Sequence, residues 1–317
     1  MANTMFEATY LAAQQITSTF DIVWALDAGL WNFRESVIQY LHDHPEANPK
    51  EVTDALVKGL HIHGLNPKRI ATELTWEYEE QYIAELLLIN AIAIFDSWVD
   101  SFVDSALLRP SNNQKKKIKK ATKEGNPSAL NNALNQEDVS LFAGSFQFTA
   151  NRQDAYIDNL WLVYKYFKVC RNCCAHGNHR FNDAAETNYS AIKGLSKEDC
   201  GIKEFPKIAF TKSGEPLKLI LRGVVGFYDV LIRIINHYDL VAADKISVEH
   251  ELLRRLSNIP SIKLSSKEQK RNRSIRQYAI SVNMCPPRSS KTNDIYKFLV
   301  AKRSRGKPRH QSQTRNI

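Results

Sequence analysis

The sequence of 317 residues lacks the short signatures that mark the commonest enzyme classes. It contains no Walker-type P-loop, no G-x-G-x-x-G, no G-x-S-x-G and no H-E-x-x-H. The usual nucleotide-binding loops, the serine-hydrolase elbow and the zinc-protease helix are therefore absent. Any chemistry that this chain performs must come from a different arrangement of residues.

The sequence also has little of what secreted and membrane proteins need. Its first fifteen residues show neither the basic segment nor the apolar core of a signal peptide. The most apolar run, residues 84–95, is shorter than the roughly 20 residues that cross a bilayer, so we expect a buried core helix there. Five cysteines, three of them crowded together, do not resemble a disulfide framework. We expect a cytoplasmic protein without a membrane partner.

Positive charge is concentrated at the C-terminal end of the chain. Residues 263–315 hold 15 Lys and Arg against two acids, a net +13, whereas the remainder holds 28 bases and 32 acids, a net −4. A basic tail on a near-neutral body is typical of contact with a polyanion, most often nucleic acid. A solvated, partly disordered tail that keeps the protein soluble explains the same composition.

Helical periodicity dominates the rest of the sequence. Apolar residues recur at three- and four-residue spacing in four long stretches, and Gly and Pro lie mainly between them. The predicted helices cover residues 5–42, 66–108, 154–177 and 217–243. Pro49 and Pro67 are each placed to open a helix, and residues 205–222 are compatible with a small hairpin around Ser213-Gly214.

The stretch "CRNCCAHGNHRF", residues 170–181, holds most of the reactive side chains. Cys170, Cys173, His176 and His179 are acceptable zinc ligands. Three-residue steps on a helix turn the chain by about 300°, so these four side chains spiral around the helix instead of converging. The spacing therefore does not favour a metal site.

Redox chemistry is also disfavoured for these cysteines. Cys170 and Cys173 have the C-x-x-C spacing, but reactive pairs of this kind lie at a helix N-terminus, where the helix dipole stabilises a thiolate. Here the cysteines end a predicted helix, where the dipole opposes the thiolate. We expect the cysteines to pack as small buried side chains.

Arg171 and His176 are residue types suited to bind and cleave a phosphate ester. Five residues of ideal helix separate the two by about 7.5 Å and about 140°. The following Gly177 is a plausible helix stop, and a long arginine can reach along the helix end. Histidine moves protons near neutral pH, and arginine stabilises a phosphoryl group that gains negative charge. Without other context, an Arg/His pair at a helix end more often serves capping or lies on the surface than takes part in catalysis.

The stretch "RNCCAHG" resembles the R-x4–6-H signature of HEPN domains, with a polar residue after the arginine. The resemblance extends by helix pattern over about residues 66–245. It implies an all-α, up-and-down HEPN-like helical bundle, preceded by an extra N-terminal helical region and followed by a basic, partly disordered tail. The corresponding regions are an N-terminal helical region at residues 1–65, a HEPN-like helical domain at 66–248, and short helices with the basic tail at 249–317.

The resemblance also implies a function. Many HEPN proteins are metal-independent endoribonucleases of toxin–antitoxin, abortive-infection and antiviral defence systems, and they commonly form homodimers with a composite active site. Carried onto this chain, His176 is the general acid/base, Arg171 stabilises the phosphorane, and Asn172 orients one of them or binds RNA. The products would be 2′,3′-cyclic phosphate and 5′-OH ends, with no cofactor and no metal. An antitoxin or defence protein is a further expected partner.

Some HEPN proteins are non-catalytic, so an RNA-binding or protein-interaction and dimerisation module is the alternative function. Further RNA contacts are expected from side chains beside the motif and in a lysine-rich connection. These candidates are His179, Arg180, Lys115, Lys116, Lys117, Lys119 and Lys120. Asp96 is a carboxylate in an apolar segment, and because a buried charge needs a partner it is a candidate support for Arg171.

Overall fold

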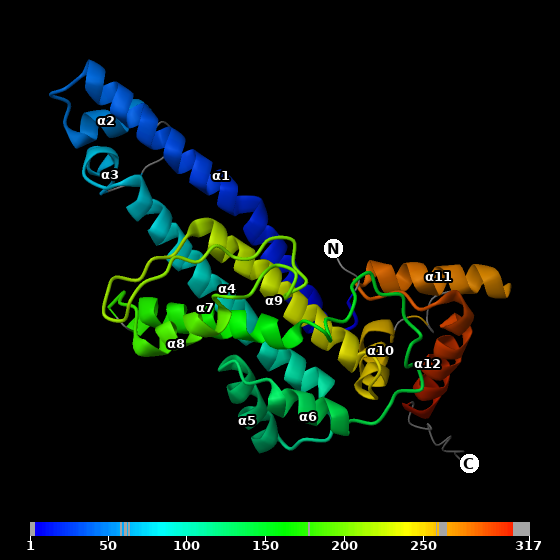
Figure 1. Cartoon of the computed structure of the whole chain (residues 1–317). Helices are drawn as coiled ribbons and strands as arrows, with labels where there is room; N and C mark the ends of the chain where they lie inside the picture. The colour runs from blue at the N-terminus through cyan, green and yellow to red at the C-terminus, as the bar shows by residue number, and fades with distance from the viewer. Residues whose placement is uncertain are drawn as a thin grey trace, which may run out of the picture. The chain divides into compact units, whose positions relative to one another are not determined.

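The computed structural model describes residues 4–57, 59, 62, 64–176, 178–257, 259 and 265–306. This part of the chain contains helices and isolated β-bridges but no strand, so the fold is all-α as predicted (Figure 1). The helices are α1 Glu7–Asp43, α2 Pro49–Leu56, α3 Pro67–Thr72, α4 Trp76–Ala106, α5 Asn112–Lys123, α6 Ser128–Gln136, α7 Ile157–His176, α8 Asp183–Ile192, α9 Leu221–Ala242, α10 Ser247–Leu256, α11 Glu268–Ser281, the 3-10 helix η2 Ser289–Lys291, and α12 Thr292–Gly306.

Local sequence signals set several helix ends. Asn48 accepts hydrogen bonds from the backbone N–H groups of Lys50 and Glu51, and the Glu51 side chain returns to the N–H of Asn48, so α2 begins with a capping box. Pro49 and Pro67 occupy the first turns of α2 and α3, as predicted. The lysine-rich connection forms the helix α5, which Ser111 caps.

The apolar run 84–95 is the middle part of the longer helix α4. The 31-residue α4 is long and apolar enough, by length and composition alone, to cross a membrane. Half of its most apolar window is buried within the structure. It is the one such helix among the described residues.

The chain divides into two compact units that are not continuous in sequence. Unit 1 comprises residues 1–14, 95–161 and 232–317, and unit 2 comprises residues 15–94 and 162–231. The helices α1, α4, α7 and α9 each contribute residues to both units. The division into three regions expected from the sequence does not correspond to these two units, and it stays a prediction.

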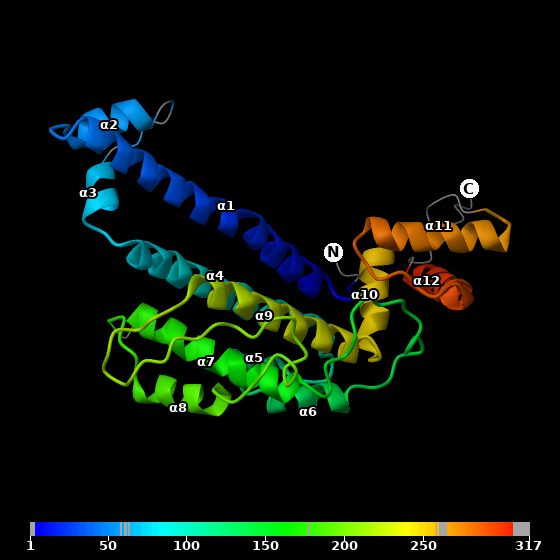
Figure 2. The same ribbon diagram turned by 45° about the horizontal axis from the view of Figure 1, so that its top comes forward.

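Unit 1 has an aromatic core. Trp98 and Phe102 of α4 stack with ring centroids 4.9 Å apart, and Trp161 donates its indole N–H to the hydroxyl of Tyr238 at 3.3 Å. Elsewhere in this unit, α5 lies against α6, and α11 lies against α12 (Figure 2). Residues 268–281 and 292–306 are helical and lie within the segment expected to contain short helices and a basic tail.

The N-terminal segment of the chain is anchored in unit 1 by a buried carboxylate. Asp239 of α9 accepts hydrogen bonds from the backbone N–H groups of Met5 at 2.6 Å and Phe6 at 3.0 Å. Burial raises the pKa of Asp239 to about 6, although these hydrogen bonds favour the charged form. A pair of α9 residues, Asp239 and Tyr238, therefore ties the first turn of α1 and the aromatic core to one helix.

Unit 2 contains the parts of α1, α4, α7 and α9 that lie outside unit 1. Phe167 of α7 and Phe227 of α9 stack with centroids 4.4 Å apart, and Tyr228 donates its hydroxyl to the carbonyl of Leu87 at 2.9 Å. The ring of Tyr166 on α7 lies 6.3 Å from that of Tyr189 on α8. These contacts hold α7, which carries the Arg/His motif, between α8 and α9.

Two glycines of α9 allow an extended segment to lie directly on the helix. A Cβ atom on Gly223 would lie 1.9 Å from the carbonyl oxygen of Lys207, and one on Gly226 would lie 3.3 Å from the Cα of Pro206. Only a residue without a side chain lets the two backbones approach this closely. The segment that follows Lys207 leads to the residues that pair with the end of α7.

Candidate functional site

The motif lies at the C-terminal end of α7, which closes at His176. Tyr164, Phe167 and Cys170 are buried on the side of α7 that faces the core. Arg171 is half-buried, and Asn172 and His176 are exposed. The periodicity that buries one side of the helix thus turns the three predicted catalytic residues toward solvent, and a helix over this stretch was correctly predicted. Gly177, the predicted stop, lies outside the described residues.

Arg171 is only partly satisfied by its neighbours. Its Nη1 donates to Oδ1 of Asn172 at 3.2 Å. Its Nε is buried and has no hydrogen-bond partner within the described part of the chain. A buried N–H without an acceptor costs free energy of roughly 1–3 kcal/mol. The Nη1 end of the guanidinium lies in an exposed environment, so that end is the one an anionic oxygen would contact.

Asn172 is in hydrogen-bond contact with the arginine, and the role expected for it stays a prediction. The amide oxygen of Asn172 faces the guanidinium, so its nitrogen, with two N–H groups, is left to donate elsewhere. His176 is one turn further along the helix, and no hydrogen bond of its imidazole is found among the residues that the structure describes. Arg171, Asn172 and His176, hereafter the α7 site, therefore present donors and one proton-transfer group at a solvent-exposed helix end.

The cysteines of the motif are buried, as predicted. Cys170, Cys173 and Cys174 are each less than 10% exposed. Burial raises the pKa of all three thiols, that of Cys174 to about 12. These thiols are therefore neutral at physiological pH and poor nucleophiles. No group of three or more potential metal ligands occurs in the described ranges of the chain.

The turn after α7 has an unusual backbone. Asn178 and His179 both have positive φ, 52° and 56°, a conformation that Asn and His tolerate better than most residues. The imidazole Nδ1 of His179 lies 3.0 Å from Oε2 of the buried Glu85. This pair directs the His179 ring toward α4, so His179 has a structural partner besides any role in RNA contact.

Arg180 anchors a long-range pairing in place of the expected hairpin. Its Nη1 donates to the carbonyl of Gly214 at 2.6 Å, and Arg180 forms an isolated β-bridge with Pro216. The prediction that residues 205–222 pair with themselves is therefore wrong. Their turn instead pairs with residues 179–181, which completes the hydrogen bonds of the segment that follows α7.

Glu85 and Gln81 were missed by sequence analysis. Gln81 donates to Glu85 at 2.8 Å and to the carbonyl of Leu217 at 3.2 Å, and it accepts from the N–H of Leu219 at 2.6 Å. The two α4 residues thus link the turn after α7 to the 214–219 segment. A carboxylate within the apolar run "AELLLINAIAIF" was the available signal, because buried charges need partners.

The remaining candidate residues belong to a different unit from the α7 site. Asp96 and the α5 lysines belong to unit 1, whereas Arg171 belongs to unit 2, so a contact between Asp96 and Arg171 stays a prediction. Lys119 forms an ion pair with Asp104 at 2.7 Å, and Lys115 donates to the Asp104 carbonyl at 3.1 Å. The remaining three lysines, Lys116, Lys117 and Lys120, are exposed.

Comparisons of this chain with protein-family models, with curated proteins and with solved structures gave no significant match. No relative therefore assigns a role to any residue. The motif resemblance and the geometry of the α7 site are the observations on which a function can be argued.

Proposed function

We propose that the protein is a metal-independent endoribonuclease of HEPN type. The observation that carries the proposal is the half-buried guanidinium of Arg171, whose Nε lacks a partner in the described structure while Asn172 holds its Nη1. An arginine with an exposed Nη1 and an exposed histidine, both near the end of the same helix, suit a phosphodiester that gains charge in the transition state.

The proposed reaction needs only the RNA and two proton-transfer groups. The ribose 2′-oxygen loses its proton to a neutral imidazole and attacks the adjacent phosphorus. The P–O5′ bond breaks as a protonated imidazole gives its proton to the 5′-oxygen. Arg171 stabilises the extra negative charge of the phosphorane. The products are a 2′,3′-cyclic phosphate and a 5′-OH end, and the overall proton count is unchanged.

Two copies of the chain would supply the two imidazoles. Each protomer contributes one His176, so a homodimer with a composite site pairs one His176 as base with the other as acid. We further propose a cytoplasmic defence or toxin–antitoxin setting, in which a second protein restrains the nuclease. These elements follow from the motif resemblance, and the α7 site is compatible with them because it is exposed.

The test is cleavage of total RNA in the presence of EDTA. Wild type is compared with Arg171→Ala and His176→Ala, and fragment ends are identified by end-specific labelling. We expect wild type to produce cyclic-phosphate ends and both variants to lose them. The conservative Arg171→Lys keeps the charge but not the forked donors, and we expect it to restore only part of the activity.

Matched controls remove an arginine and a histidine elsewhere. Arg109→Ala breaks a surface ion pair with Asp138, and His250→Ala removes an exposed histidine of α10. Both controls should cleave RNA as wild type does. Cleavage that survives Arg171→Ala and His176→Ala overturns the site. Binding of RNA without any cleavage by wild type supports the non-catalytic RNA-binding module instead.

A further inference from the structure

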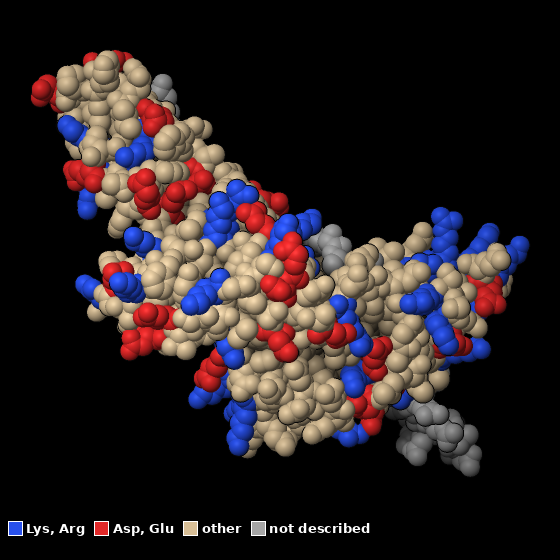
Figure 3. All heavy atoms as spheres, in the orientation of Figure 1, with Lys and Arg blue, Asp and Glu red and all other residues tan. Residues whose placement is uncertain are grey.

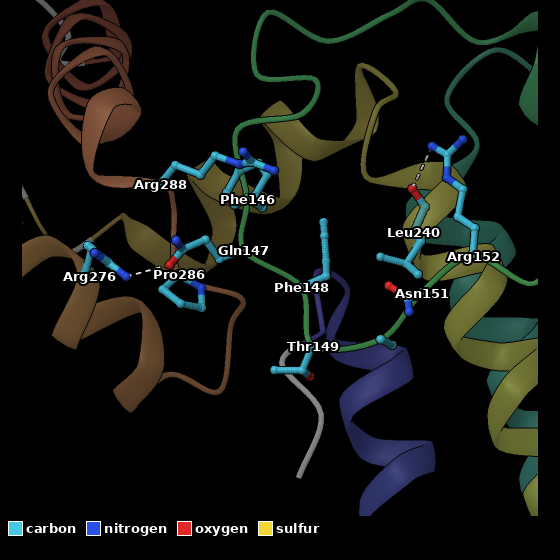
Figure 4. A pocket seen from close by; sticks show the side chains of 11 residues that line it. Phe146, Gln147, Phe148, Thr149, Asn151, Arg152, Leu240, Arg276, Pro286 and Arg288 are labelled. Atoms are coloured by element: carbon cyan, nitrogen blue, oxygen red, sulfur yellow. Dashed lines mark hydrogen bonds between the residues drawn. The ribbon is translucent and has the colours of Figure 1, made fainter.

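A second candidate site lies entirely within unit 1. A hollow of about 760 Å³ is formed by residues 146–152, which precede α7, together with residues of α9, α11 and the segment before η2 (Figure 4). Volumes of 300–1,000 Å³ are typical of ligand sites. Figure 4 shows Phe148 in the middle, with Arg276 and Arg288 on one side and Asn151, Leu240 and Arg152 on the other.

The charge of this hollow is positive without compensation from its walls. Arg152, Arg276 and Arg288 line it, and no acidic residue does. Arg276 donates to two neutral oxygens, Oγ of Ser289 at 2.7 Å and Oε1 of Gln147 at 2.6 Å. These bonds fix the guanidinium but leave its charge unpaired and further N–H groups available. Arg152 differs, because it forms an ion pair with Asp244.

A smaller hollow of about 400 Å³ continues the positive surface along α11. Arg276 lines both hollows, and Arg273 is added in the second one. Its wall also includes Ile280, which is 53% exposed, and again no acidic residue. The two cavities, hereafter the arginine hollows, thus share one guanidinium and extend beyond the size of a single phosphate.

Some described arginines elsewhere in unit 1 are paired with acidic residues. Arg109 pairs with Asp138, and Arg254 pairs with Glu7 and Glu251. Figure 3 shows Lys and Arg side chains gathered over α11 and α12 on the face in view. Arg273, Arg276 and Arg288 line the hollows without an acidic residue among the lining side chains, and such a group of guanidinium charges matches the negative charges of a phosphodiester chain.

An aromatic ring adds a second kind of contact. Phe148 is half-buried, so part of its ring is available, and the buried Phe146 supports it with ring centroids 6.4 Å apart. Exposed bases stack on aromatic rings in proteins that bind single strands, whereas the bases of a duplex are covered by their own stacking. The combination of ring and arginines therefore favours a single strand.

We propose that the arginine hollows bind single-stranded RNA, with one base stacked on Phe148 and the adjoining phosphates held by Arg276, Arg288 and Arg273. The choice of RNA among single-stranded polynucleotides rests on the proposed function. The site itself rests on the hollows, and it supplies affinity without any proton-transfer group in its walls.

The probe is a fluorescently labelled 12-nucleotide 2′-O-methyl RNA. It lacks the 2′-OH that the proposed cleavage requires, so binding to the full-length wild-type chain is measured without turnover. We expect the single strand to bind much more tightly than the same sequence as a duplex. Equal affinity for the duplex, or for a mononucleotide, would overturn a stacked single strand as the ligand, and tighter binding of the matching DNA strand would overturn RNA.

Substitutions in the hollows test the two kinds of contact separately. Phe148→Ala and Phe148→Leu should each weaken binding by about tenfold to a hundredfold, because leucine keeps apolar bulk without an aromatic face. A 2-aminopurine base in the probe should be quenched by wild type and not by Phe148→Leu. Arg276→Gln with Arg288→Gln should weaken binding about tenfold and make the slope of log affinity against log salt shallower by about 1.4.

A matched control removes the same charge outside the hollows. Lys267→Gln with Lys297→Gln changes two exposed lysines of the α11 and α12 region that line neither hollow. We expect its affinity to stay within about threefold of wild type. An equal loss in both double variants would show diffuse attraction and overturn the site. Specific loss in the hollow variants upholds it even if no RNA is cleaved, so the two proposals fail independently.

Discussion

The α7 site and the arginine hollows are both cationic, but they differ in what their side chains can do. The α7 site combines one partly unsatisfied arginine with an exposed histidine, a residue type capable of general acid/base chemistry. The hollows combine several arginines with a phenylalanine, and no histidine or carboxylate is among their lining residues. Positive charge alone therefore does not distinguish a catalytic site from a binding surface, whereas the presence of a proton-transfer group does.

The largest expected effect separates rate from affinity. His176→Ala should lower the single-turnover cleavage rate at saturating RNA by about 10²- to 10⁴-fold and leave 2′-O-methyl RNA binding unchanged. Arg276→Gln with Arg288→Gln should leave that saturated rate unchanged and raise the RNA concentration for half-maximal rate. A hollow variant that lowers the saturated rate as much as His176→Ala would break the comparison.

The stability of unit 1 should depend on pH because of the buried Asp239. Its folded-state pKa is raised to about 6, so its favourable contribution to unit 1 is complete below about pH 4 and is lost as pH rises through 6. A shift of about two units corresponds to about 3 kcal/mol. Asp239→Asn cannot titrate, so the difference in unfolding free energy between it and wild type should change over pH 4–7.

The Asp239 measurement has a clear negative outcome. Parallel stability curves for wild type and Asp239→Asn over this window would mean that the carboxylate is not held neutral by burial. The asparagine of this variant also places an amide near a backbone N–H of the N-terminal segment, so a constant loss of about 1–3 kcal/mol is expected at every pH.

Gly223→Ala should damage unit 2 while sparing the arginine hollows. The added methyl group would meet the Lys207 carbonyl, and the displaced segment leads to the residues that pair with Arg180. We expect a loss of about 2 kcal/mol in unfolding free energy and lower cleavage, with RNA binding retained below the transition. Gly29 lies in α1, and a Cβ atom there would have no neighbouring atom within 4 Å. Gly29→Ala should therefore increase the unfolding free energy by up to about 1 kcal/mol. Equal effects would contradict the close approach.

The smallest effect is expected on α5. Lys119 already pairs with Asp104, so Lys119→Gln should cost at most about 0.5 kcal/mol of stability and change RNA affinity by less than about twofold. Titration of the 2′-O-methyl probe measures the affinity. A loss as large as that of the arginine variants would assign the main RNA contact to α5.

The helical part of the fold was predictable because its signals are local. Apolar spacing located α1, α7 and α9, and Pro49 and Pro67 lie where α2 and α3 begin. The stretch 66–108, expected as one helix, is divided into α3 and α4. The hairpin was wrongly predicted because the turn at Ser213-Gly214 pairs with Phe181, more than thirty residues away. Strand-like pairing depends on which segments meet in space, and short sequence patterns do not specify that.

The candidate sites show the same limit. Arg171, Asn172 and His176 were found because one helical segment carries all three. Gln147 and Arg276 lie 129 residues apart, and only the folded unit 1 brings them into hydrogen-bond contact. The lysines of α5 were located by composition, but composition did not reveal that the Asp104 carboxylate neutralises Lys119.

The burial of all five native cysteines makes the chain suited to selective chemical labelling. Burial also raises their pKa values, to about 11 for Cys200 and about 12 for Cys285, so thiol reagents that need a thiolate should leave the folded protein unmodified. The exposed Ala175 precedes His176. Ala175→Cys would therefore introduce a single reactive thiol, and a fluorophore attached there would report the arrival of a strand or a second protomer at the end of α7.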